Sequence, residues 1–546
     1  NSQVPFLPIS SRRYFSNKYK FNHRIYSNLD KNITSKELAI FSSINTKGLL
    51  EEIEKRQSKL KSLEGPQKEI ANQLRIINQK ISNLKVDQKQ IKDLLKEKER
   101  LEKKLYRLLP ELKTRIVNIE DLTEVMPNDS ILIEYVRYYP WKKGEWDSPR
   151  YLALVLDPSK KESNDKSNLS EYKIHTIDLG LAETLDNKIK TALIATEEGL
   201  ADAPQLLKDL GESIIKPIAA VTKKSKTWFI TPDGELNKIP FAALGGLEEN
   251  SLLSEGRKIR LLTTGRELID LKKKNKSKKN ISLVLANPNF DKYEKNFLEA
   301  KQIKPSIKFI SSQNRSMDLG VFKWAPLPGT VKEGKIIADT INARLLVEDK
   351  ATAKEIINIR RPKILHIASH SFYLNNQEKN IKSSKDPLIT QNTKPLNYFA
   401  NNENHLLRSG IVLAGANNPE TNKEDDGYLT ASEVSQLDWN GTELVVISGC
   451  KSGLGEIKNG EGIYGLKRAI SVSGAKSSLL SLWKVDDEAT ADFMENFYMR
   501  LIEGEGRAEA LINTQREFRN HKNKNYRHPY IWAAFQLSGD WRPINW

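Results

Sequence analysis

The sequence predicts an α/β protein in which a mostly parallel β-sheet carries helices on both faces and follows an N-terminal helical arm. Two patterns favour this fold. Apolar residues recur at helical spacing over residues 48–109, and from residue 281 onward short apolar, β-branched runs alternate with helical stretches. Such alternation is typical of parallel sheets whose crossover helices cover both faces. At 546 residues the chain exceeds what one core usually serves, so two or three domains are expected.

Residues 1–46 are predicted to be a flexible or partly packed lead-in. They are rich in Ser, Asn, Arg and Tyr, but they show neither the amphipathic helix nor the cleavage signal of a transit peptide. The chain starts at Asn1 without a methionine, so we expect it to have been processed or cut from something longer.

Residues 47–115 are predicted to be a helical hairpin or coiled-coil arm. A heptad-like seam is formed by Leu74, Ile77, Ile81 and Leu84. Gly65-Pro66 interrupts the pattern because proline cannot continue a helix interior, and a second helix of roughly 40 residues is expected to follow. The arm either binds a partner or covers the domains that follow, and the spacing leaves both interpretations open.

Two α/β regions are predicted after the arm, residues 116–280 and 281–546, with a lysine-rich linker at their boundary. The strand runs expected in the first region are residues 131–136, 151–156 and 228–230. Those expected in the second are residues 281–286, 363–368, 443–447 and 477–483, with helices at 334–343, 462–472, 488–501 and 508–519.

Charge and hydropathy exclude several classes of partner. No apolar run approaches the roughly 20 residues that cross a bilayer, so no membrane partner is expected. Lys and Arg number 87 against 70 Asp and Glu, but they are spread along the chain. We therefore expect a solubilising excess and no direct binding of nucleic acid. The alternative, nucleic-acid binding by the basic N-terminal region, predicts strongly salt-dependent affinity.

Cys450 is the only cysteine in the chain. This excludes intramolecular disulfides and thiolate-rich metal sites, and it fits a reducing compartment such as the cytoplasm. A lone cysteine is often a small buried hydrophobe, so its neighbours must decide its role.

His370 and Cys450 each follow a predicted buried strand. The carboxyl ends of such strands form the usual site crevice of an α/β sheet. There, an imidazole takes the proton of the thiol and later protonates the leaving amine. Glycines at 449, 453 and 455 allow a tight turn whose backbone N–H groups point at a developing oxyanion.

The order of the pair along the chain separates classes of cysteine enzyme. His370 precedes Cys450 by 80 positions. Papain-like peptidases and cysteine glutaminases place the nucleophile first, whereas the caspase clan uses the order found in this chain. The clan's spacing is usually shorter, and we interpret polar residues 375–404 as an inserted loop that absorbs the difference.

An ordered set of short motifs extends from about residue 131 to the terminus. They are TPDGEL at 231–236, IPFAAL at 239–244, LPGT at 327–330, HIASH at 366–370, DGYLTA at 426–431, GEG at 460–462, SLW at 481–483, FY at 497–498, HPYIWAAF at 528–535 and GDW at 539–541. This ordered set resembles the CHAT domain, a caspase-like peptidase often found behind tetratricopeptide repeats in bacteria and related to separase. The resemblance implies a caspase-like fold with a pseudo-peptidase half before about residue 280 and an active half after it. It also implies that repeats preceded Asn1.

The same resemblance assigns the catalytic roles. His370 and Cys450 form the catalytic pair, and the N–H groups of Ser371 and Cys450 bind the oxyanion. Ser371 stands where the family usually has glycine, and Gly449 stands where alanine is more common. Serine still offers its N–H and the second change is small, so activity is expected, with no cofactor and no metal.

Substrate preference rests on the segment after the Leu-Trp motif. In separases an acidic group in this place helps to select a basic residue before the cleaved bond, and Asp487 is similarly placed. We predict that Asp487 and Trp483 bind substrate. Alternatively, Asp486 or Asp487 caps the next helix, and Trp483, like Trp532, packs in the core.

Two further residue types are expected to be structural. His366 alternates with core-facing positions on its strand, which favours a hydrogen-bonded core histidine. Asp425 and Asp426 precede a glycine, a pattern that indicates a turn more than a cation site.

We therefore expect a cysteine endopeptidase that cleaves a protein substrate. A regulatory protein or effector is expected to act through the N-terminal helical region, and the expected setting is bacterial signalling or defence. The alternative is a non-catalytic interaction scaffold with the same fold.

Overall fold

The structure is a computed structural model, and it describes residues 25–26, 29, 33–59, 65–82, 88–108, 116–158, 172–272, 280–292, 323–374, 405–419, 421, 425–449, 452–458, 460 and 462–546. Cys450 lies outside these residues, and so do the first 24 residues of the predicted lead-in and the whole predicted insertion at 375–404.

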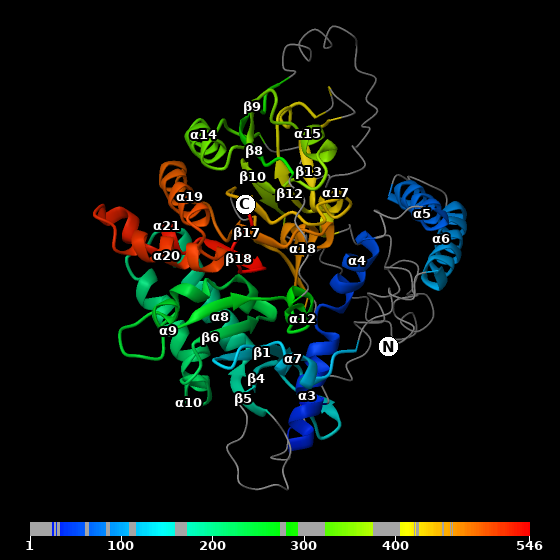
Figure 1. The fold of residues 1–546 in the computed structure, drawn as a ribbon. Helices are drawn as coiled ribbons and strands as arrows, with labels where there is room; N and C mark the ends of the chain where they lie inside the picture. The colour runs from blue at the N-terminus through cyan, green and yellow to red at the C-terminus, as the bar shows by residue number, and fades with distance from the viewer. Residues whose placement is uncertain are drawn as a thin grey trace, which may run out of the picture.

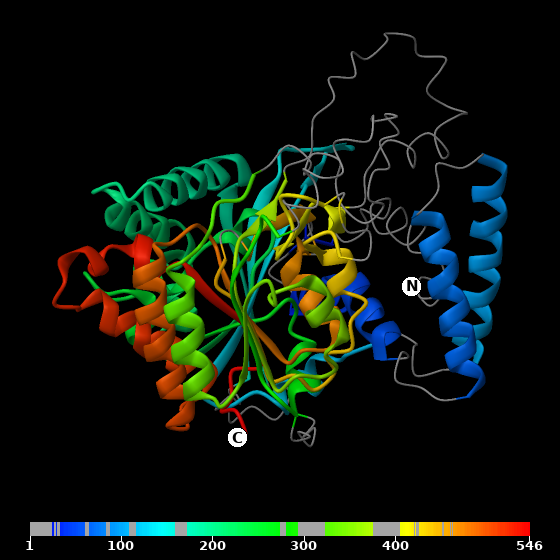
Figure 2. The same ribbon diagram turned by 90° about the horizontal axis from the view of Figure 1, so that it is seen from above.

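Two β-sheets form the centre of the molecule (Figures 1 and 2). In spatial order, the first consists of β5 (Lys173–Leu181), β4 (Arg150–Asp157), β1 (Ser130–Tyr138), β6 (Thr227–Thr231) and β7 (Lys258–Leu261). The second consists of β18 (Phe535–Gly539), β17 (Ser477–Ser481), β14 (Leu444–Ile447), β10 (Ile364–Ala368), β8 (Leu283–Pro288) and β9 (Arg344–Glu348).

The second sheet is parallel from β17 to β9, and β18 is its antiparallel edge. The first sheet is mixed, because β1, β6 and β7 run parallel whereas β4 and β5 are antiparallel to their neighbours. The predicted mixed α/β class, with mostly parallel strands and helices on both faces, is therefore confirmed.

Helices cover the two faces of the sheets in separate sets. One set lines a face that both sheets share, namely α8 (Ala182–Glu197), α9 (Ala203–Ile214), α14 (Thr330–Thr340), α19 (Asp487–Ile502) and α20 (Arg507–Arg519). The opposite face of the first sheet is covered by α3 (Ile33–Thr46), α7 (Ile119–Thr123) and α12 (Glu267–Lys272). That of the second sheet is covered by α15 (Ala353–Asn358), α17 (Ala431–Val434) and α18 (Leu466–Ser473).

The apolar core is continuous between the sheets on their shared face. Ile133 of β1, Val446 of β14 and Phe493 of α19 belong to one buried cluster. None of the described helices combines the length and the apolar character that a bilayer crossing requires.

Several smaller elements surround the two sheets. They are β2 (Trp141–Lys142), β3 (Glu145–Trp146), β11 (Ser371–Tyr373), β12 (Ser409–Val412), β13 (Tyr428–Thr430), β15 (Gly455–Lys458), β16 (Gly462–Gly465), α10 (Ala219–Thr222), α11 (Leu253–Gly256) and α21 (Pro529–Trp532). The helix predicted over residues 462–472 was thus wrong at its start, because Gly462–Gly465 pairs with β15 and only then does α18 begin. Gly465 allows this pairing, since a side chain there would lie 2.6 Å from the carbonyl oxygen of Leu454.

The N-terminal region contains α4 (Leu49–Lys59), α5 (Pro66–Ser82) and α6 (Gln88–Leu108). The predicted single helix of about 40 residues was wrong, because this stretch forms two helices that pack side by side, apart from the sheets (Figures 1 and 2). Among the side chains of this pair that the structure describes, the buried apolar ones are Ile70, Ile77, Leu101 and Leu105.

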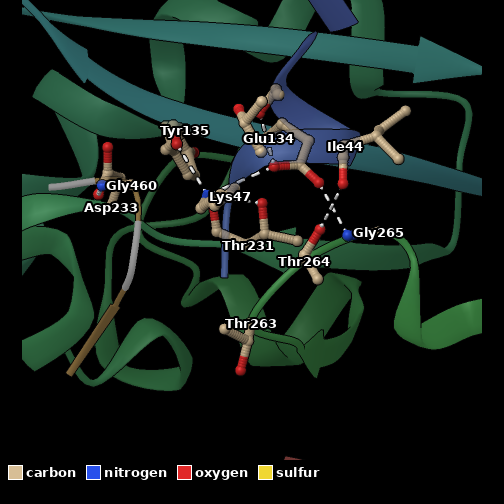
Figure 3. A network of polar contacts seen from close by, with 12 residues as sticks. Ile44, Lys47, Glu134, Tyr135, Thr231, Asp233, Thr263, Thr264, Gly265 and Gly460 are labelled. Atoms are coloured by element: carbon tan, nitrogen blue, oxygen red, sulfur yellow. Dashed lines mark hydrogen bonds and ion pairs between the residues drawn. The ribbon is translucent and has the colours of Figure 1, made fainter. Parts of the chain in front are cut away.

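A buried polar network joins the α3–α4 turn to the first sheet (Figure 3). The ammonium of Lys47, which is 4% exposed, donates to the carbonyl oxygens of Tyr135 and Thr231 at 2.9 and 2.7 Å and to the Thr231 hydroxyl at 2.9 Å. It also forms an ion pair with Glu134 at 3.4 Å. Glu134 is fully buried and accepts further bonds from Ser43 and from the N–H of Gly265. This network fixes the start of α4 against the sheet.

Candidate functional site

The strands that precede His370 and Cys450 are neighbours in the second sheet. β10 and β14 are parallel, with Ile367 opposite Ile447. The pairing continues one step further, because the N–H of Ser448 donates to the carbonyl oxygen of Ile367 at 3.1 Å. The segments that follow β10 and β14 therefore leave the sheet at the same edge, where the carboxyl ends of the two strands lie.

Gly449 comes unusually close to the segment that carries His370. A methyl group at Gly449 would lie 2.0 Å from the carbonyl oxygen of Ser369 and 3.2 Å from the amide nitrogen of Ser371. Side chains do not approach backbone oxygens so closely. Position 449 therefore requires glycine, because an alanine side chain would collide with the segment that carries His370. We had expected this change from alanine to be a small one.

His370 is held by two aromatic rings and one backbone carbonyl. Its ring centroid lies 5.3 Å from those of Phe290 and Trp324, and its Nε2 lies 2.9 Å from the carbonyl oxygen of Ala325. Because a carbonyl oxygen only accepts, Nε2 carries the hydrogen in the neutral ring and Nδ1 is the basic nitrogen. No described residue donates a hydrogen bond to Nδ1.

The surroundings of His370 favour its neutral form. Burial lowers the pKa of His370 below its ordinary value, and the positive charge of Lys484 lowers it further. The hydrogen bond to Ala325 and the negative charge of Asp487 act in the opposite direction without cancelling the effect of burial. A neutral imidazole at neutral pH is the form that accepts a proton.

Ser371 begins β11 and is 6% exposed. It lies opposite Ile411 of β12, so its backbone is positioned by a small sheet beside the site. Its amide nitrogen lies next to Gly449, 3.2 Å from the position that a methyl group on Gly449 would occupy.

Asp487 and Asp486 have different roles at the start of α19. Asp486 is the N-cap, and its side chain accepts hydrogen bonds from the N–H groups of Glu488 and Ala489 at 3.1 and 3.0 Å. Asp487 is half-buried against the start of α14, where a methyl group on Gly329 would lie 2.7 Å from its Cβ. Of the two alternatives for the cap, Asp486 is therefore the capping residue.

The carboxylate of Asp487 lies in a region of negative charge. Burial raises the pKa of Asp487, and the charges of Glu333 and Asp486 raise it further, whereas Lys484 and His370 lower it. Glu333 is 1% exposed, and one of its carboxylate oxygens has no hydrogen-bond partner among the described residues. A cation bound next to Asp487 would lower its pKa and so favour the ionised carboxylate.

Three other residues singled out in the sequence are buried. His366 is fully buried, with Nε2 3.0 Å from Glu333 and Nδ1 3.2 Å from the hydroxyl of Tyr498, as expected for a core histidine. Trp483 is 2% exposed and donates its indole N–H to the carbonyl oxygen of Tyr530 at 2.8 Å. Trp532 is 3% exposed. Trp483 therefore packs beneath the strand end, and any contact with substrate would involve little of its ring.

Asp425 and Asp426 form a turn. Asp425 accepts from the N–H groups of Gly427 and Lys354, and Asp426 accepts from the N–H of Tyr428. Over the described part of the chain, no cluster of three or more His, Cys, Asp and Glu side chains is arranged to hold a metal ion.

Sequence reasoning missed the groups that orient His370. Phe290 and Trp324 are distant in sequence from the predicted pair, and Ala325 contributes only its backbone carbonyl. The aromatic residues carry no motif, and a carbonyl has no residue signature at all. The nearby LPGT motif at 327–330 was the only available signal for this segment.

Comparisons with known proteins give one family and several distant relatives. The CHAT domain matches residues 204–540. Tetratricopeptide repeat protein 28 of Homo sapiens is 24% identical over 324 residues, which cover 56% of this chain and 12% of that protein. The Mus musculus protein of the same name is 25% identical over 224 residues, covering 40% and 9%. The chain thus spans only a small part of the length of these curated relatives.

Among solved structures, the Saccharomyces cerevisiae separase–securin complex aligns with a TM-score of 0.44 at 10% identity, covering 97% of this chain and 37% of that chain. The Arg-specific cysteine proteinase gingipain R aligns with a TM-score of 0.33 at 11% identity, covering 66% and 76%.

Proposed function

The chain belongs to the CHAT family, and from this membership and the surroundings of His370 we propose that it is a cysteine endopeptidase of the caspase and separase clan. The observation that supports the proposal most strongly is the close approach of Gly449 to residues 369–371. Cys450 is bonded to Gly449, so we propose that its thiol acts together with the imidazole of His370.

In the proposed reaction, Nδ1 of His370 takes the proton of the Cys450 thiol, and the thiolate attacks the peptide carbonyl carbon. The N–H groups of Ser371 and Cys450 bind the oxyanion, and the imidazolium protonates the leaving amine. Water then hydrolyses the thioester. A basic Nδ1 and a neutral ring, both favoured by the contacts of His370, are what the first step requires.

The proposal also assigns different roles to two regions of the chain. Residues 116–280 would be the pseudo-peptidase half, because the only cysteine lies in residues 281–546, the active half. A lone reduced thiol suits a reducing compartment such as the cytoplasm. A setting in bacterial signalling or defence stays a prediction, since the two curated relatives are mammalian.

The test is cleavage of a fluorogenic peptide panel by the wild type and by Cys450→Ala. Turnover that is lost in the variant supports the peptidase. A wild type with a folded structure and no turnover that depends on Cys450 favours the non-catalytic scaffold instead. A proteomic comparison of cleaved termini with the same two proteins would identify substrates.

We also propose that Asp487 selects a basic residue before the scissile bond. Burial and the negative charge of Glu333 both disfavour the ionised carboxylate of Asp487. A substrate guanidinium or ammonium would compensate for this and would be stabilised there. Asp487→Ala is expected to reduce the preference for Arg and Lys by about thirtyfold or more. Asp486→Ala is the matched control, because it removes the helix cap and leaves Asp487 in place. An unchanged preference in Asp487→Ala would reject the pocket.

A regulatory partner is proposed to act through the N-terminal helices. The N–H of Gly48, at the start of α4, donates to the carbonyl oxygen of Gly460 at 2.8 Å, and Glu54 of α4 pairs with Arg468 of α18 at 2.9 Å. Gly460 and Arg468 follow Cys450 closely in sequence, so movement of α4 would reach the nucleophile loop.

If these contacts hold the enzyme in a restrained state, Glu54→Gln is expected to raise partner-free turnover. Glu52→Gln is the control, since Glu52 pairs with Arg56 and Arg266 and with nothing described in α18. A wild type that cleaves at full rate alone, or a Glu54→Gln protein no faster than Glu52→Gln, contradicts regulation through the arm.

A further inference from the structure

The end of strand β17 is bonded to both sides of the nucleophile loop. Ile447 of β14 lies opposite Leu480 of β17, and there the ladder between the two strands ends. Ser481, the next residue of β17, donates its hydroxyl hydrogen to the carbonyl oxygen of Gly449. Its N–H donates to the hydroxyl of Ser452 at 2.9 Å, and its carbonyl accepts from the N–H of Gly453 at 2.7 Å.

Ser452 completes the arrangement. Its hydroxyl hydrogen goes to the carbonyl oxygen of Ile447 at 2.9 Å, while its oxygen accepts the N–H of Ser481. Each hydroxyl has one hydrogen to donate, and both hydrogens are directed to backbone carbonyls, that of Ile447 at the end of β14 and that of Gly449 in the loop. The side chains of Ser452 and Ser481 are 1% and 0% exposed, which protects these bonds from competition with water.

The bond from Ser481 to Gly449 has a directional consequence. A peptide group is planar and trans, so its C=O and its N–H point in opposite directions. Fixing the carbonyl oxygen of Gly449 therefore fixes the direction of the N–H in the same peptide group. That N–H belongs to Cys450, and it is one of the two proposed oxyanion donors.

We propose that Ser481 is a positioning residue for the oxyanion site, with Ser452 as its support. This inference rests on the proposed peptidase function. Ser481 would leave the thiol and the imidazole untouched and act only on the direction of one N–H group. The step it serves is therefore stabilisation of the tetrahedral oxyanion and not formation of the thiolate.

The experiment compares Ser481→Ala with Ser477→Ala. Ser477 is a matched control because it lies at the other end of β17, is also buried, and donates its hydroxyl to a backbone carbonyl, that of Glu443, at 2.7 Å. Both variants lose one buried serine hydrogen bond of the same kind. Only Ser481→Ala is expected to lower kcat, by at least about tenfold, because loss of an oxyanion donor costs about a hundredfold or more. KM should change little.

A second readout separates positioning from general disorder of the loop. Cys450 is the only cysteine, so alkylation by iodoacetamide reports on one thiol. Alkylation forms no oxyanion, and its rate and pH profile are expected to be the same in wild type and Ser481→Ala. A parallel fall in alkylation and kcat would show a collapsed loop and overturn the positioning role.

The two proposals fail in different ways. Equal kcat in Ser481→Ala and Ser477→Ala, with a wild type whose turnover depends on Cys450, overturns the role of Ser481 and leaves the peptidase intact. Absence of any Cys450-dependent turnover in the wild type overturns both.

Discussion

The two sheets end their parallel strands in different ways. In the first, β6 ends at Thr231 opposite Glu134, and the buried ammonium of Lys47 occupies the polar groups there (Figure 3). In the second, β10 and β14 lead to His370 and Gly449, and Nδ1 of His370 has no donor among the described side chains. One strand end is closed by internal bonds and the other retains a basic nitrogen. Similar strand arrangements thus end either in polar groups that are all paired or in a nitrogen that is still able to accept a proton.

The strongest test of this comparison removes the groups of the second half that are proposed to react. Cys450→Ala and His370→Ala are each expected to reduce cleavage by about a thousandfold or more. Both proteins should remain folded, because His370 is held at the edge of the sheet and not in its core. Turnover and chemical denaturation measure the two effects. Retained cleavage in Cys450→Ala would refute the assignment of the nucleophile.

The matching test in the first half concerns stability. Lys47→Met leaves Glu134 buried without its cation and is expected to cost about 3 kcal/mol or more in the free energy of unfolding. The double variant Lys47→Met, Glu134→Gln should recover part of this loss, since the uncompensated charge is gone. Urea unfolding of the three proteins decides the matter. A single variant as stable as the wild type would mean that the ion pair is not needed to close the first strand end.

Gly449→Ala tests the contact between the loops that carry His370 and Cys450. The added methyl group meets the carbonyl oxygen of Ser369, so the loops must move apart, at a cost of about 1 to 3 kcal/mol. Cleavage is expected to fall by about tenfold, because small misplacements weaken positioned chemistry. Gly256→Ala in the first half is the control, since nothing lies within 4 Å of the added atom. Equal activity of the two variants would speak against a close fit at Gly449.

The smallest expected effect is a shift in pH dependence. The base must be neutral, so kcat/KM should rise with pH through the pKa of His370, which burial holds below the ordinary 6.5. Asp487 raises this pKa, so Asp487→Asn should move the acid limb to lower pH. Lys484 lowers it, so Lys484→Met should move the limb to higher pH. The profiles are measured with a peptide that is uncharged before the scissile bond, and shifts in the same direction would contradict this account.

Much of the second half could be predicted from sequence because its central strands are continuous apolar runs. β8, β10, β14 and β17 lie where those runs lie, and α14, α19 and α20 begin within a few residues of the predicted starts. β5 and β9 were missed because edge strands bury only some of their residues and show no such run. The hairpin β15–β16 was missed because its glycines were interpreted as loop and helix signals.

For the candidate site, sequence reasoning placed His370 at the correct edge of the sheet because a strand followed by a polar residue is recognisable. It could not find the carbonyl of Ala325, which any residue would supply. It also assigned no role to Ser452 or Ser481, since serines near a glycine-rich turn are common and their partners are backbone atoms. The catalytic and substrate-binding roles predicted for His370, Cys450, Ser371, Trp483 and Asp487 stay predictions.

The continuous core on the shared face of the two sheets limits how the molecule is able to change shape. A hinge between the halves would expose residues such as Ile133 and Phe493 to water, and each buried methylene that is exposed costs about 0.8 kcal/mol. The free energy of binding a ligand is therefore enough to move loops and surface helices, but not to open a hinge between the halves. The halves should also melt together, in a single cooperative transition, and neither is expected to persist when the other is lost.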